Sequence, residues 1–287
     1  MAAASRLRDL LETDNNIVVC PGVYDGFTAR MALNAGLDAV YMTGAGTMMS
    51  RLGMADLGVA SLNDMKENAG MIAKLDRSVP LIADVDTGYG GPLMVGRTIE
   101  EYMQAGVAAL HLEDQVIVDT ETFVARIRAA VNKRRELGGD IVIIARTDAL
   151  QSLGYEAAVS RLKAAIKAGA DVAFLEGFTN KEDGRRVCKE LSPTPVLLNM
   201  VGGGVTPDIS VTEARDLGFK AIIYPCFAMI PVYQAVTAAA KELRDTGDLK
   251  VVGKPKIGPK ELFEVCGPQE MIEFDVAAGG KLFSNGV

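Results

Sequence analysis

The segment LIADVDTGYGG, residues 81–91, places two aspartates one residue apart at the end of an apolar run. The apolar pattern predicts a buried strand over residues 80–86, and side chains two residues apart in a strand point to the same face. Asp84 and Asp86 would then lie side by side where the strand ends. Two like charges at such close range are unfavourable unless a cation or a proton neutralises one of them.

Polar side chains also follow the other apolar runs of the chain. The polar residues at the expected strand ends include six acids and one arginine. They are Tyr41, Thr43, Asp84, Asp86, His111, Glu113, Asp114, Arg146, Asp148, Glu176 and Asn199. If these ends meet at one mouth, the acids form a site for a hard divalent cation, Mg²⁺ or alternatively Mn²⁺. For any single acid, a helix cap or an ion pair is the alternative. The Asp84–Asp86 pair beside Glu113 favours the metal.

The remaining titratable residues limit the chemistry further. A single histidine, His111, excludes a metal site with several histidines and disfavours a Ser-His-Asp triad. His111 lies within a predicted strand, so a hydrogen-bonded core residue and a catalytic residue are equally compatible with the sequence. Arg146 is either a structural ion-pair partner or a clamp for a substrate carboxylate. The four cysteines show no metal spacing, which favours free thiols in a reducing compartment.

Eight short apolar runs alternate with helical patterns, as expected for strands buried on both faces of a parallel sheet. The predicted strands are residues 17–22, 39–44, 80–86, 108–114, 141–148, 172–177, 195–200 and 221–226. The phrases NAGLDAVYM, QAGVAALHL, KAGADVAFL and DLGFKAIIY each join a helix end, a glycine and the next strand. Eight such units predict an α/β fold of the (β/α)8 TIM-barrel class. A doubly wound sheet is the alternative, but CPGVYDGFTAR lacks the G-x-G-x-x-G that it would require.

Composition and charge exclude several classes of protein. The net charge of −7 argues against nucleic acid or an anionic membrane surface as a partner, and no apolar run reaches the roughly 20 residues that span a bilayer. The N-terminal MAAASRLRDLLETDNN is typical of a short amphipathic helix rather than a secretory signal. We therefore expect a cytoplasmic protein, with an organelle matrix as the alternative. One barrel domain is expected over residues 1–287, in which residues 250–287 form a C-terminal helical extension.

Six motifs, in this order, resemble those of the isocitrate lyase / phosphoenolpyruvate mutase superfamily: YMTGAG, ADLG, DVDTGYGG, RTIEEYMQAGVAALHLEDQ, IIARTDA and LNMVGGGVTP. The resemblance covers residues 19–233 and is closest to the branch of 2,3-dimethylmalate lyases, oxaloacetate hydrolases and methylisocitrate lyases. It implies a (β/α)8 barrel that exchanges its last helix with a neighbouring subunit, usually in a homotetramer. Residues 250–287 would then pack on a partner subunit. The implied substrate is a small dicarboxylate.

The resemblance also implies roles for individual residues. Asp84 and Asp86 match the carboxylates that bind Mg²⁺, while Asp56 and Glu113 match acids around the water shell of the ion. Substrate contacts are implied for Thr43, Gly44, Ala45, Asp84, Arg146, Glu176, Asn199 and Thr206. Tyr41, Arg146 and Glu113 are the expected catalytic residues.

The sequence departs from the superfamily pattern in two places. After LEDQ, members usually continue into a mobile loop with K-[KR]-C-G-H, whose cysteine is the general acid, but here LEDQV runs directly into IVDTETFVARI. Either the loop is absent or a segment is missing from the sequence, and the abrupt join favours the second explanation, which an intact mass would test. After the last predicted strand, YPCFAMIPVY carries no basic residue for the third carboxylate of a tricarboxylate.

These features favour a Mg²⁺-dependent carbon–carbon lyase. Its expected substrate is a substituted malate-like 2-hydroxy dicarboxylate, 2,3-dimethylmalate or a related acid, which it would split into a 2-oxo acid and a carboxylate. Hydrolysis or decarboxylation of oxaloacetate is the alternative within the superfamily. The oxaloacetate hydrolases favour a serine near the position of Thr206, so the threonine supports the lyase. A truly absent loop would favour a decarboxylase or a non-catalytic ligand-binding relative.

Overall fold

The computed structural model describes residues 2–250 and 257–281, and in it eight parallel strands close into a barrel. The strands follow one another around the barrel in chain order, and the pairing of the first with the eighth closes it. Their bounds are β1 Val18–Val23, β2 Val40–Met42, β3 Leu81–Asp84, β4 Ala109–Glu113, β5 Val142–Thr147, β6 Val172–Leu175, β7 Val196–Asn199 and β8 Ala221–Tyr224. The predicted (β/α)8 fold is confirmed, and so are the eight predicted strands, to within two residues at each end.

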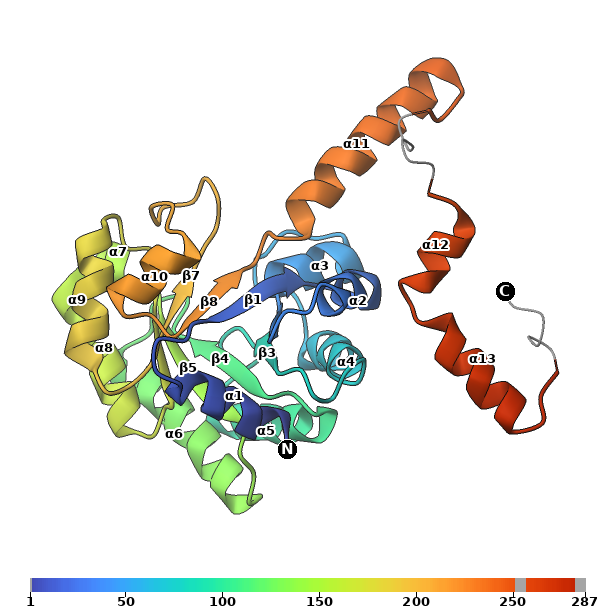
Figure 1. Ribbon diagram of the computed structural model, residues 1–287. Helices are drawn as coiled ribbons and strands as arrows, with labels where there is room; N and C mark the ends of the chain where they lie inside the picture. Colours follow the sequence, from blue (N-terminus) through green and yellow to red (C-terminus); the bar gives the residue numbers. More distant parts are fainter. Residues whose placement is uncertain (1, 251–256, 282–287) are drawn as a thin grey trace. The chain divides into compact units, whose positions relative to one another are not determined.

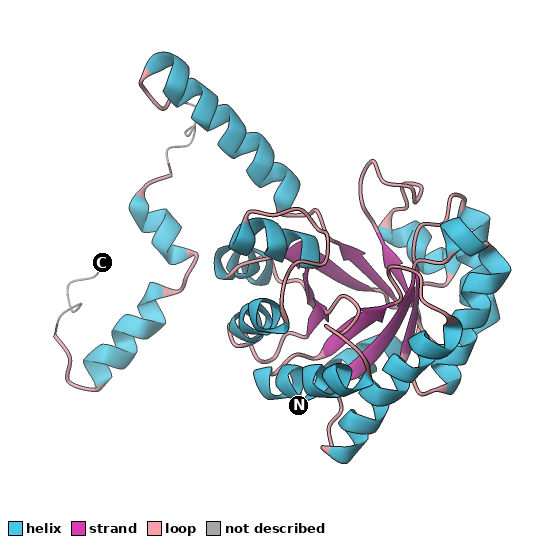
Figure 2. Cartoon of the chain, turned by 180° about the vertical axis from the view of Figure 1, so that it is seen from behind, coloured by secondary structure: helices cyan, strands magenta, loops and turns pink. Residues whose placement is uncertain are grey.

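Helices follow the strands and surround the barrel, as Figures 1 and 2 show. Two helices follow β2 and two follow β5, whereas a single helix follows each of the other strands up to β7. The bounds are α2 Gly26–Asn34, α3 Gly44–Leu52, α4 Leu62–Ala73, α5 Pro92–Ala105, α6 Thr120–Glu136, α7 Leu150–Leu153, α8 Tyr155–Lys167, α9 Lys181–Leu191 and α10 Val211–Leu217.

Local sequence signals explain where these helices begin and end. Ser61 and Ser210 are the N-caps of α4 and α10, and each side chain accepts a hydrogen bond from the backbone N–H three residues further on. Gly106 and Gly218 end α5 and α10 with φ angles of 88° and 106°, a left-handed conformation that glycine adopts without steric cost. Both glycines belong to the repeated helix-Gly-strand phrase. The prediction that this phrase joins the end of a helix to the next strand is therefore confirmed.

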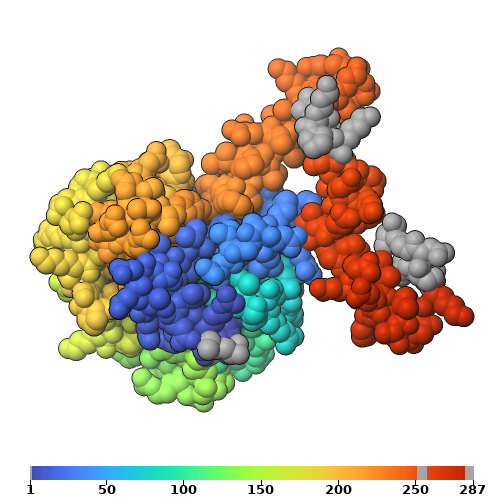
Figure 3. Space-filling view, viewed as in Figure 1, coloured from blue at the N-terminus to red at the C-terminus, as the bar shows by residue number. Residues whose placement is uncertain are grey.

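The first helix, α1 (Ala3–Glu12), packs at the amino ends of the strands. Its Ala4, Leu7 and Leu11 are buried in the same apolar cluster as Val18 and Val142, which lie at the starts of β1 and β5. In Figure 3 the residues near the N-terminus, drawn in blue, lie packed against the rest of the barrel unit. The predicted amphipathic helix is confirmed. Apolar packing closes this end of the barrel, and polar side chains gather at the carboxyl ends of the strands.

The chain divides into two compact units, Met1–Ala228 and Met229–Val287. The second unit contains α11 Met229–Thr246, α12 Pro259–Glu264 and α13 Pro268–Ala277. None of these three helices buries a residue, although they carry several large apolar side chains. None of the described helices combines the length and the hydropathy that a membrane span requires.

Candidate active site

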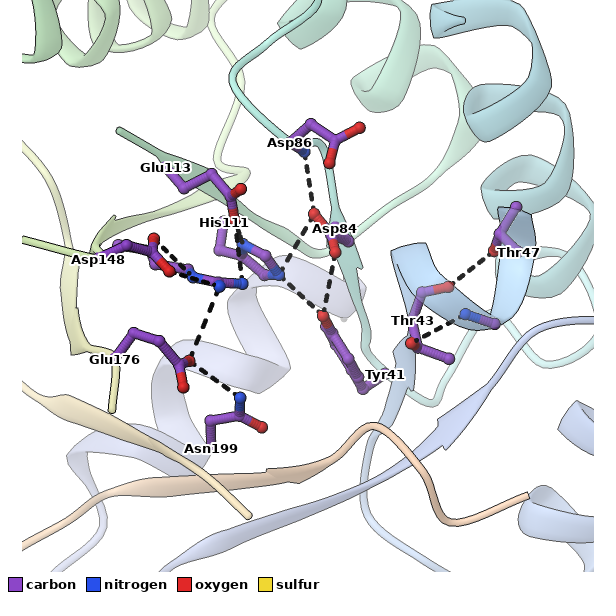
Figure 4. A network of polar contacts seen from close by, with 12 residues as sticks. Tyr41, Thr43, Thr47, Asp84, Asp86, His111, Glu113, Asp148, Glu176 and Asn199 are labelled. Atoms are coloured by element: carbon purple, nitrogen blue, oxygen red, sulfur yellow. Dashed lines mark hydrogen bonds and ion pairs between the residues drawn. The ribbon is translucent and has the colours of Figure 1, made fainter. Parts of the chain in front are cut away.

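Five side chains converge at the carboxyl ends of four neighbouring strands: Tyr41, Asp84, His111 and Glu113, which Figure 4 labels, and Arg146. The register of the sheet brings them together, because Asp84 pairs with His111, and Glu113 pairs with Arg146, on adjacent strands. The exposed fraction is 7% for Asp84, 0% for His111 and 3% for Glu113. Titratable groups buried to this degree need partners within the site.

Tyr41 connects His111 with Asp84. Its hydroxyl lies 2.9 Å from Nε2 of His111 and 3.4 Å from Oδ2 of Asp84. The phenol has one proton, so it donates either to the imidazole or to the carboxylate. Burial lowers the pKa of His111, which favours the neutral imidazole. A neutral His111 can accept a proton that passes through the hydroxyl of Tyr41.

Arg146 lies among three carboxylates. Its Nε and Nη2 donate to the two oxygens of Asp148 at 3.1 and 2.8 Å, and its Nη1 lies 2.9 Å from Oε2 of Glu113. Glu176 is a longer contact, 3.8 Å from Nη2. Paired contacts of this kind fix the plane of a guanidinium. The Arg146 side chain is 16% exposed, so part of this side chain remains accessible to a ligand.

The acids of this cluster outnumber its single arginine, and their pKa values reflect the excess negative charge. Burial, with repulsion from Asp84 and Asp56, raises the pKa of Asp86 to about 7. Burial also raises the pKa of Glu113 well above its ordinary value, in spite of the attraction of Arg146. Such a cluster holds either additional protons or a cation at neutral pH.

Asp84, His111 and Glu113 form a group that could hold a metal ion. Each offers one ligand atom, and these atoms lie within 4.8 Å of one another. Nδ1 of His111 is buried and has no hydrogen-bond partner in the described part of the chain. Carboxylate oxygens suit Mg²⁺, and an imidazole nitrogen beside them suits Mn²⁺. The donor set and the excess negative charge therefore fit a divalent cation.

Asp86 lies beyond the strand, and the prediction that it continues β3 is wrong. The strand ends at Asp84, and Asp86 has a φ angle of 48°, in the left-handed region that aspartate tolerates better than most residues. Its backbone N–H donates to Oδ1 of Asp84 at 2.9 Å (Figure 4). The two aspartates are thus joined through a turn rather than by the alternation of a strand. Asp56 lies in the loop between α3 and α4, where partial burial and the charge of Asp84 raise its pKa.

The start of α3 packs directly against Asp84. Thr43 is the N-cap of this helix, and its side-chain oxygen accepts a hydrogen bond from the N–H of Gly46 at 3.3 Å. A Cβ added to Gly44 would lie 2.4 Å from Oδ2 of Asp84, so the close approach requires glycine. The N–H groups of the first helical turn, those of Gly44 and Ala45 among them, have no intrahelical acceptor and favour an anion.

Glu176 and Asn199 extend the network to β6 and β7. Nδ2 of Asn199 donates to Oε2 of Glu176 at 2.9 Å, and Oδ1 of Asn199 is buried with no partner among the described residues. Burial raises the pKa of Glu176. Thr206 is buried in the loop between β7 and α10 and makes no hydrogen bond to this network within the described ranges. An unpaired acceptor on Asn199 is suited to a hydroxyl group of a ligand.

The connection between β4 and α6 is short. It comprises residues 114–119 and forms a turn at residues 115–117, without a cysteine. A cavity of about 590 Å³ borders this turn and is lined by Leu57, Tyr89, Met94, Val116 and Asp86, among others. The described residues of this connection therefore supply no thiol that could act as a general acid.

Two side chains of this cluster received no definite role from the sequence, Asp148 and His111. Asp148 is the principal partner of Arg146, although the sequence shows it only as one of several strand-end acids. The R-x-D spacing, which puts both side chains on one face of a strand end, is a signal that could have identified it. The sequence left His111 open between core and site, and the structure places it in the site.

The fold and these side chains define a (β/α)8-barrel enzyme with an acidic site, competent for a divalent cation, at the carboxyl ends of its strands. The chain matches the profile of the phosphoenolpyruvate phosphomutase family over residues 7–244, and it belongs to that family. The resemblance identified from the motifs is confirmed. The chain is 36% identical over 293 residues to 2,3-dimethylmalate lyase from Eubacterium barkeri, with 97% of this chain and 100% of the relative covered.

Solved structures show the same similarity. A crystal structure of 2,3-dimethylmalate lyase is 52% identical with a TM-score of 0.96, covering 100% of this chain and 99% of its own. The structure of oxaloacetate acetylhydrolase in complex with 3,3-difluorooxalacetate is 50% identical with a TM-score of 0.95, covering 98% of this chain and 99% of its own. The structure of a phosphonopyruvate hydrolase complex with oxalate and Mg²⁺ is 26% identical with a TM-score of 0.86, covering 96% of this chain and 99% of its own.

Proposed function

We propose that the protein is a Mg²⁺-dependent carbon–carbon lyase that cleaves a substituted malate-like 2-hydroxy dicarboxylate, 2,3-dimethylmalate or a close relative. The observation that carries this proposal is the arrangement of the buried acids Asp84 and Glu113 beside the partly exposed Arg146 at one mouth. Acids that can share a divalent cation lie there beside an arginine that can bind a carboxylate. Similarity to 2,3-dimethylmalate lyases, at 36% and 52% identity, supports the substrate class.

The metal would be held from the β3 side of the mouth. Asp84 and Asp86 would bind it, and Asp56 and Glu113 would hold its water shell. A bound Mg²⁺ or Mn²⁺ supplies Lewis-acid stabilisation of negative charge on the C2 oxygen of the substrate. The magnesium in the phosphonopyruvate hydrolase structure, at 26% identity, supports this assignment.

Two regions would bind the carboxylates of the substrate. The helix start at Thr43, Gly44 and Ala45 offers backbone N–H groups to one carboxylate, beside Asp84. Arg146 offers its guanidinium to the charge that develops when the bond breaks. Glu176, Asn199 and Thr206 would line the remainder of the pocket on the side of β6 and β7.

Tyr41 and His111 would move the proton. The C2 hydroxyl proton passes to the oxygen of Tyr41 while the proton of Tyr41 passes to Nε2 of His111, 2.9 Å away. The C2–C3 bond breaks, C2 becomes the carbonyl carbon of a 2-oxo acid, and the electron pair remains on the other fragment as an enolate. Return of the proton through Tyr41 to C3 gives the second carboxylate, so atoms and charge balance. Oδ1 of Asp84 lies 3.6 Å from Nε2 of His111, and its negative charge stabilises the imidazolium that forms transiently on His111.

The test is a substrate panel followed by proton NMR in the presence of Mg²⁺. We expect 2,3-dimethylmalate to give pyruvate and propanoate in equal amounts, because breaking its C2–C3 bond yields these two acids. Malates with other substituents at C2 and C3 should react more slowly. A panel in which no 2-hydroxy dicarboxylate is cleaved would refute the proposal.

Hydrolysis of oxaloacetate is the second candidate. The 50% identity to oxaloacetate acetylhydrolase favours it almost as strongly as the lyase, and the same C2–C3 bond would break. Thr206, where the oxaloacetate hydrolases favour serine, supports the lyase. The same NMR panel separates the two, because oxaloacetate would give oxalate and acetate.

We also propose that the helices after residue 250 pack on a neighbouring subunit in a homotetramer. Met271 and Phe274 of α13 are 61% and 79% exposed, and a cavity of about 530 Å³ with an apolar lining borders both residues. Large apolar side chains left uncovered in this way are typical of interfaces. Sedimentation velocity at micromolar concentration should give a tetramer, or at least a dimer, and a monomer alone would contradict the packing.

For the compartment, we propose the cytoplasm, with an organelle matrix as the alternative. The four cysteines are free thiols, two of them buried, which fits a reducing environment. Fractionation of cells that express the tagged protein tests this assignment, and recovery from a secreted fraction would contradict it.

A further inference from the structure

A second buried ion pair lies directly behind the site, between Asp114 and Arg161. Nε of Arg161, on α8, donates to Oδ2 of Asp114 at 2.8 Å. Asp114 is 0% exposed and Arg161 is 4% exposed, so neither side chain is accessible to a substrate in the mouth. A buried pair of charges is costly to desolvate and carries little net stability by itself, so its retention calls for another role.

Asp114 is hydrogen-bonded to both residues that follow Arg146. Its Oδ2 accepts from the hydroxyl of Thr147 at 2.6 Å, and its Oδ1 accepts from the backbone N–H of Asp148 at 2.9 Å. Asp148 in turn receives the paired hydrogen bonds of Arg146. A continuous chain of contacts therefore runs from α8 through Asp114 and Asp148 to the guanidinium of Arg146.

Arg161 also holds the connection between β4 and α6. Its Nη2 donates to the carbonyl of Val118 at 2.6 Å, and its Nη1 donates to the hydroxyl of Thr120 at 3.2 Å. The guanidinium lies 5.6 Å from the centre of the Phe123 ring. One side chain thus secures the end of β5, through Asp114, and the short connection that borders the mouth.

We propose that Asp114 and Arg161 are positioning residues that fix Asp148, and through it the orientation of Arg146 for binding a substrate carboxylate. The inference rests on the proposed function, because it takes the ligand of Arg146 to be a carboxylate. Asp114 follows Glu113 in the chain, and Glu113 is the other close partner of Arg146. Two consecutive residues therefore set the orientation of the guanidinium of Arg146. Glu113, the last residue of β4, contacts it directly, and Asp114 acts on it through Asp148.

Two variants test the proposal with oxalate as the probe. Asp114→Asn keeps an acceptor for the N–H of Asp148 but turns an amide donor toward Thr147 and Arg161. Arg161→Lys keeps the buried charge, so it should fold even if the first variant does not, but it cannot make all three contacts of the guanidinium fork. In both variants we expect oxalate, in the presence of Mg²⁺, to bind about tenfold more weakly or worse by titration calorimetry.

Binding of Mg²⁺ alone is the internal comparison. It should change by less than about threefold, since the hydrogen bonds of Asp114 and Arg161 go to the end of β5 and to the β4–α6 connection rather than to the acids that would hold the metal. Arg134→Lys is the matched control, because Arg134 pairs with Asp171, is 15% exposed and, among the described residues, makes no hydrogen bond to the site. It should leave oxalate binding as in the wild type.

The outcomes separate the inference from the proposed function. Wild-type affinity for oxalate in Arg161→Lys would overturn the positioning role, and so would an equal loss in Arg134→Lys. Wild-type protein that binds oxalate but cleaves no malate would refute the proposed reaction while leaving the positioning role supported. Wild-type protein that binds no oxalate would overturn both.

Discussion

Replacing Asp86 with asparagine is the most informative single change at the metal site. The substitution keeps the size of the side chain and removes one negative charge. Asparagine tolerates the φ angle of 48° at this position as well as aspartate does. The backbone N–H of residue 86 can still donate to Oδ1 of Asp84, so the turn should be preserved.

The size of the effect follows from the pKa of Asp86. Burial and the neighbouring acids raise it from 3.8 to about 7, and each pKa unit corresponds to about 1.4 kcal/mol. Ionised Asp86 therefore lowers the stability of the metal-free protein by at most about 4 kcal/mol above pH 7. Asp86 is partly exposed, and solvent screening reduces this to about 1–3 kcal/mol. The metal-free variant should then melt about 2–10 °C higher than wild type at pH 8.

The gain should depend on pH in a definite direction. A carboxyl group whose pKa is higher in the folded state binds more protons there than in the unfolded state. Wild-type stability is therefore lost as the pH rises from about 4 to about 7, over the interval between the two pKa values. The variant has no such group at residue 86, so its advantage should grow over this interval and then level off.

Melting curves of both proteins, with and without Mg²⁺, provide the assay. Wild type should be stabilised by Mg²⁺, by about 2.7 kcal/mol at one hundred times the dissociation constant, and the variant much less. Most of the turnover should be lost as well. If the variant shows the full Mg²⁺-dependent rise, retains its turnover and has an unchanged metal-free midpoint, Asp86 serves only the turn and the reasoning is refuted.

Three further changes test other parts of the site. Gly44→Ala would place a Cβ 2.4 Å from Oδ2 of Asp84, and we expect about tenfold weaker Mg²⁺ binding by calorimetry, with unchanged affinity as the contrary result. Arg146→Lys would lose the paired contacts to Asp148, and kcat/KM in the substrate assay should fall by about 100-fold or more while Mg²⁺ binding persists; a fall of less than tenfold would argue against the clamp. Tyr41→Phe should lower kcat by about 10²–10⁴-fold with little change in KM, and a loss confined to KM would indicate a binding role instead.

Most of the fold could be predicted because its signals are local. Near-continuous apolar runs predicted each strand, and glycines such as Gly106 and Gly218 marked where helices end. These glycines adopt left-handed backbone angles in the structure, as the helix-Gly-strand phrase requires. Repetition of the phrase then predicted the barrel.

The details of the site depend on turns and on contacts distant in sequence, and these could not be predicted. Asp86 was placed in the strand because strand alternation was extended beyond Asp84, whereas its left-handed backbone begins the turn there. The role of His111 depends on the register that places it beside Asp84. Asp114 and Arg161 are 47 residues apart, and only the closed barrel brings them together.

The central claim is that the acidic cluster binds a divalent cation on which carbon–carbon cleavage depends. Its most direct test is pyruvate release from 2,3-dimethylmalate, followed with a coupled dehydrogenase, by protein treated with EDTA and then supplied with metal. We expect no release after EDTA treatment and full recovery with Mg²⁺ or Mn²⁺. Undiminished pyruvate release by protein shown to be free of metal would contradict the claim.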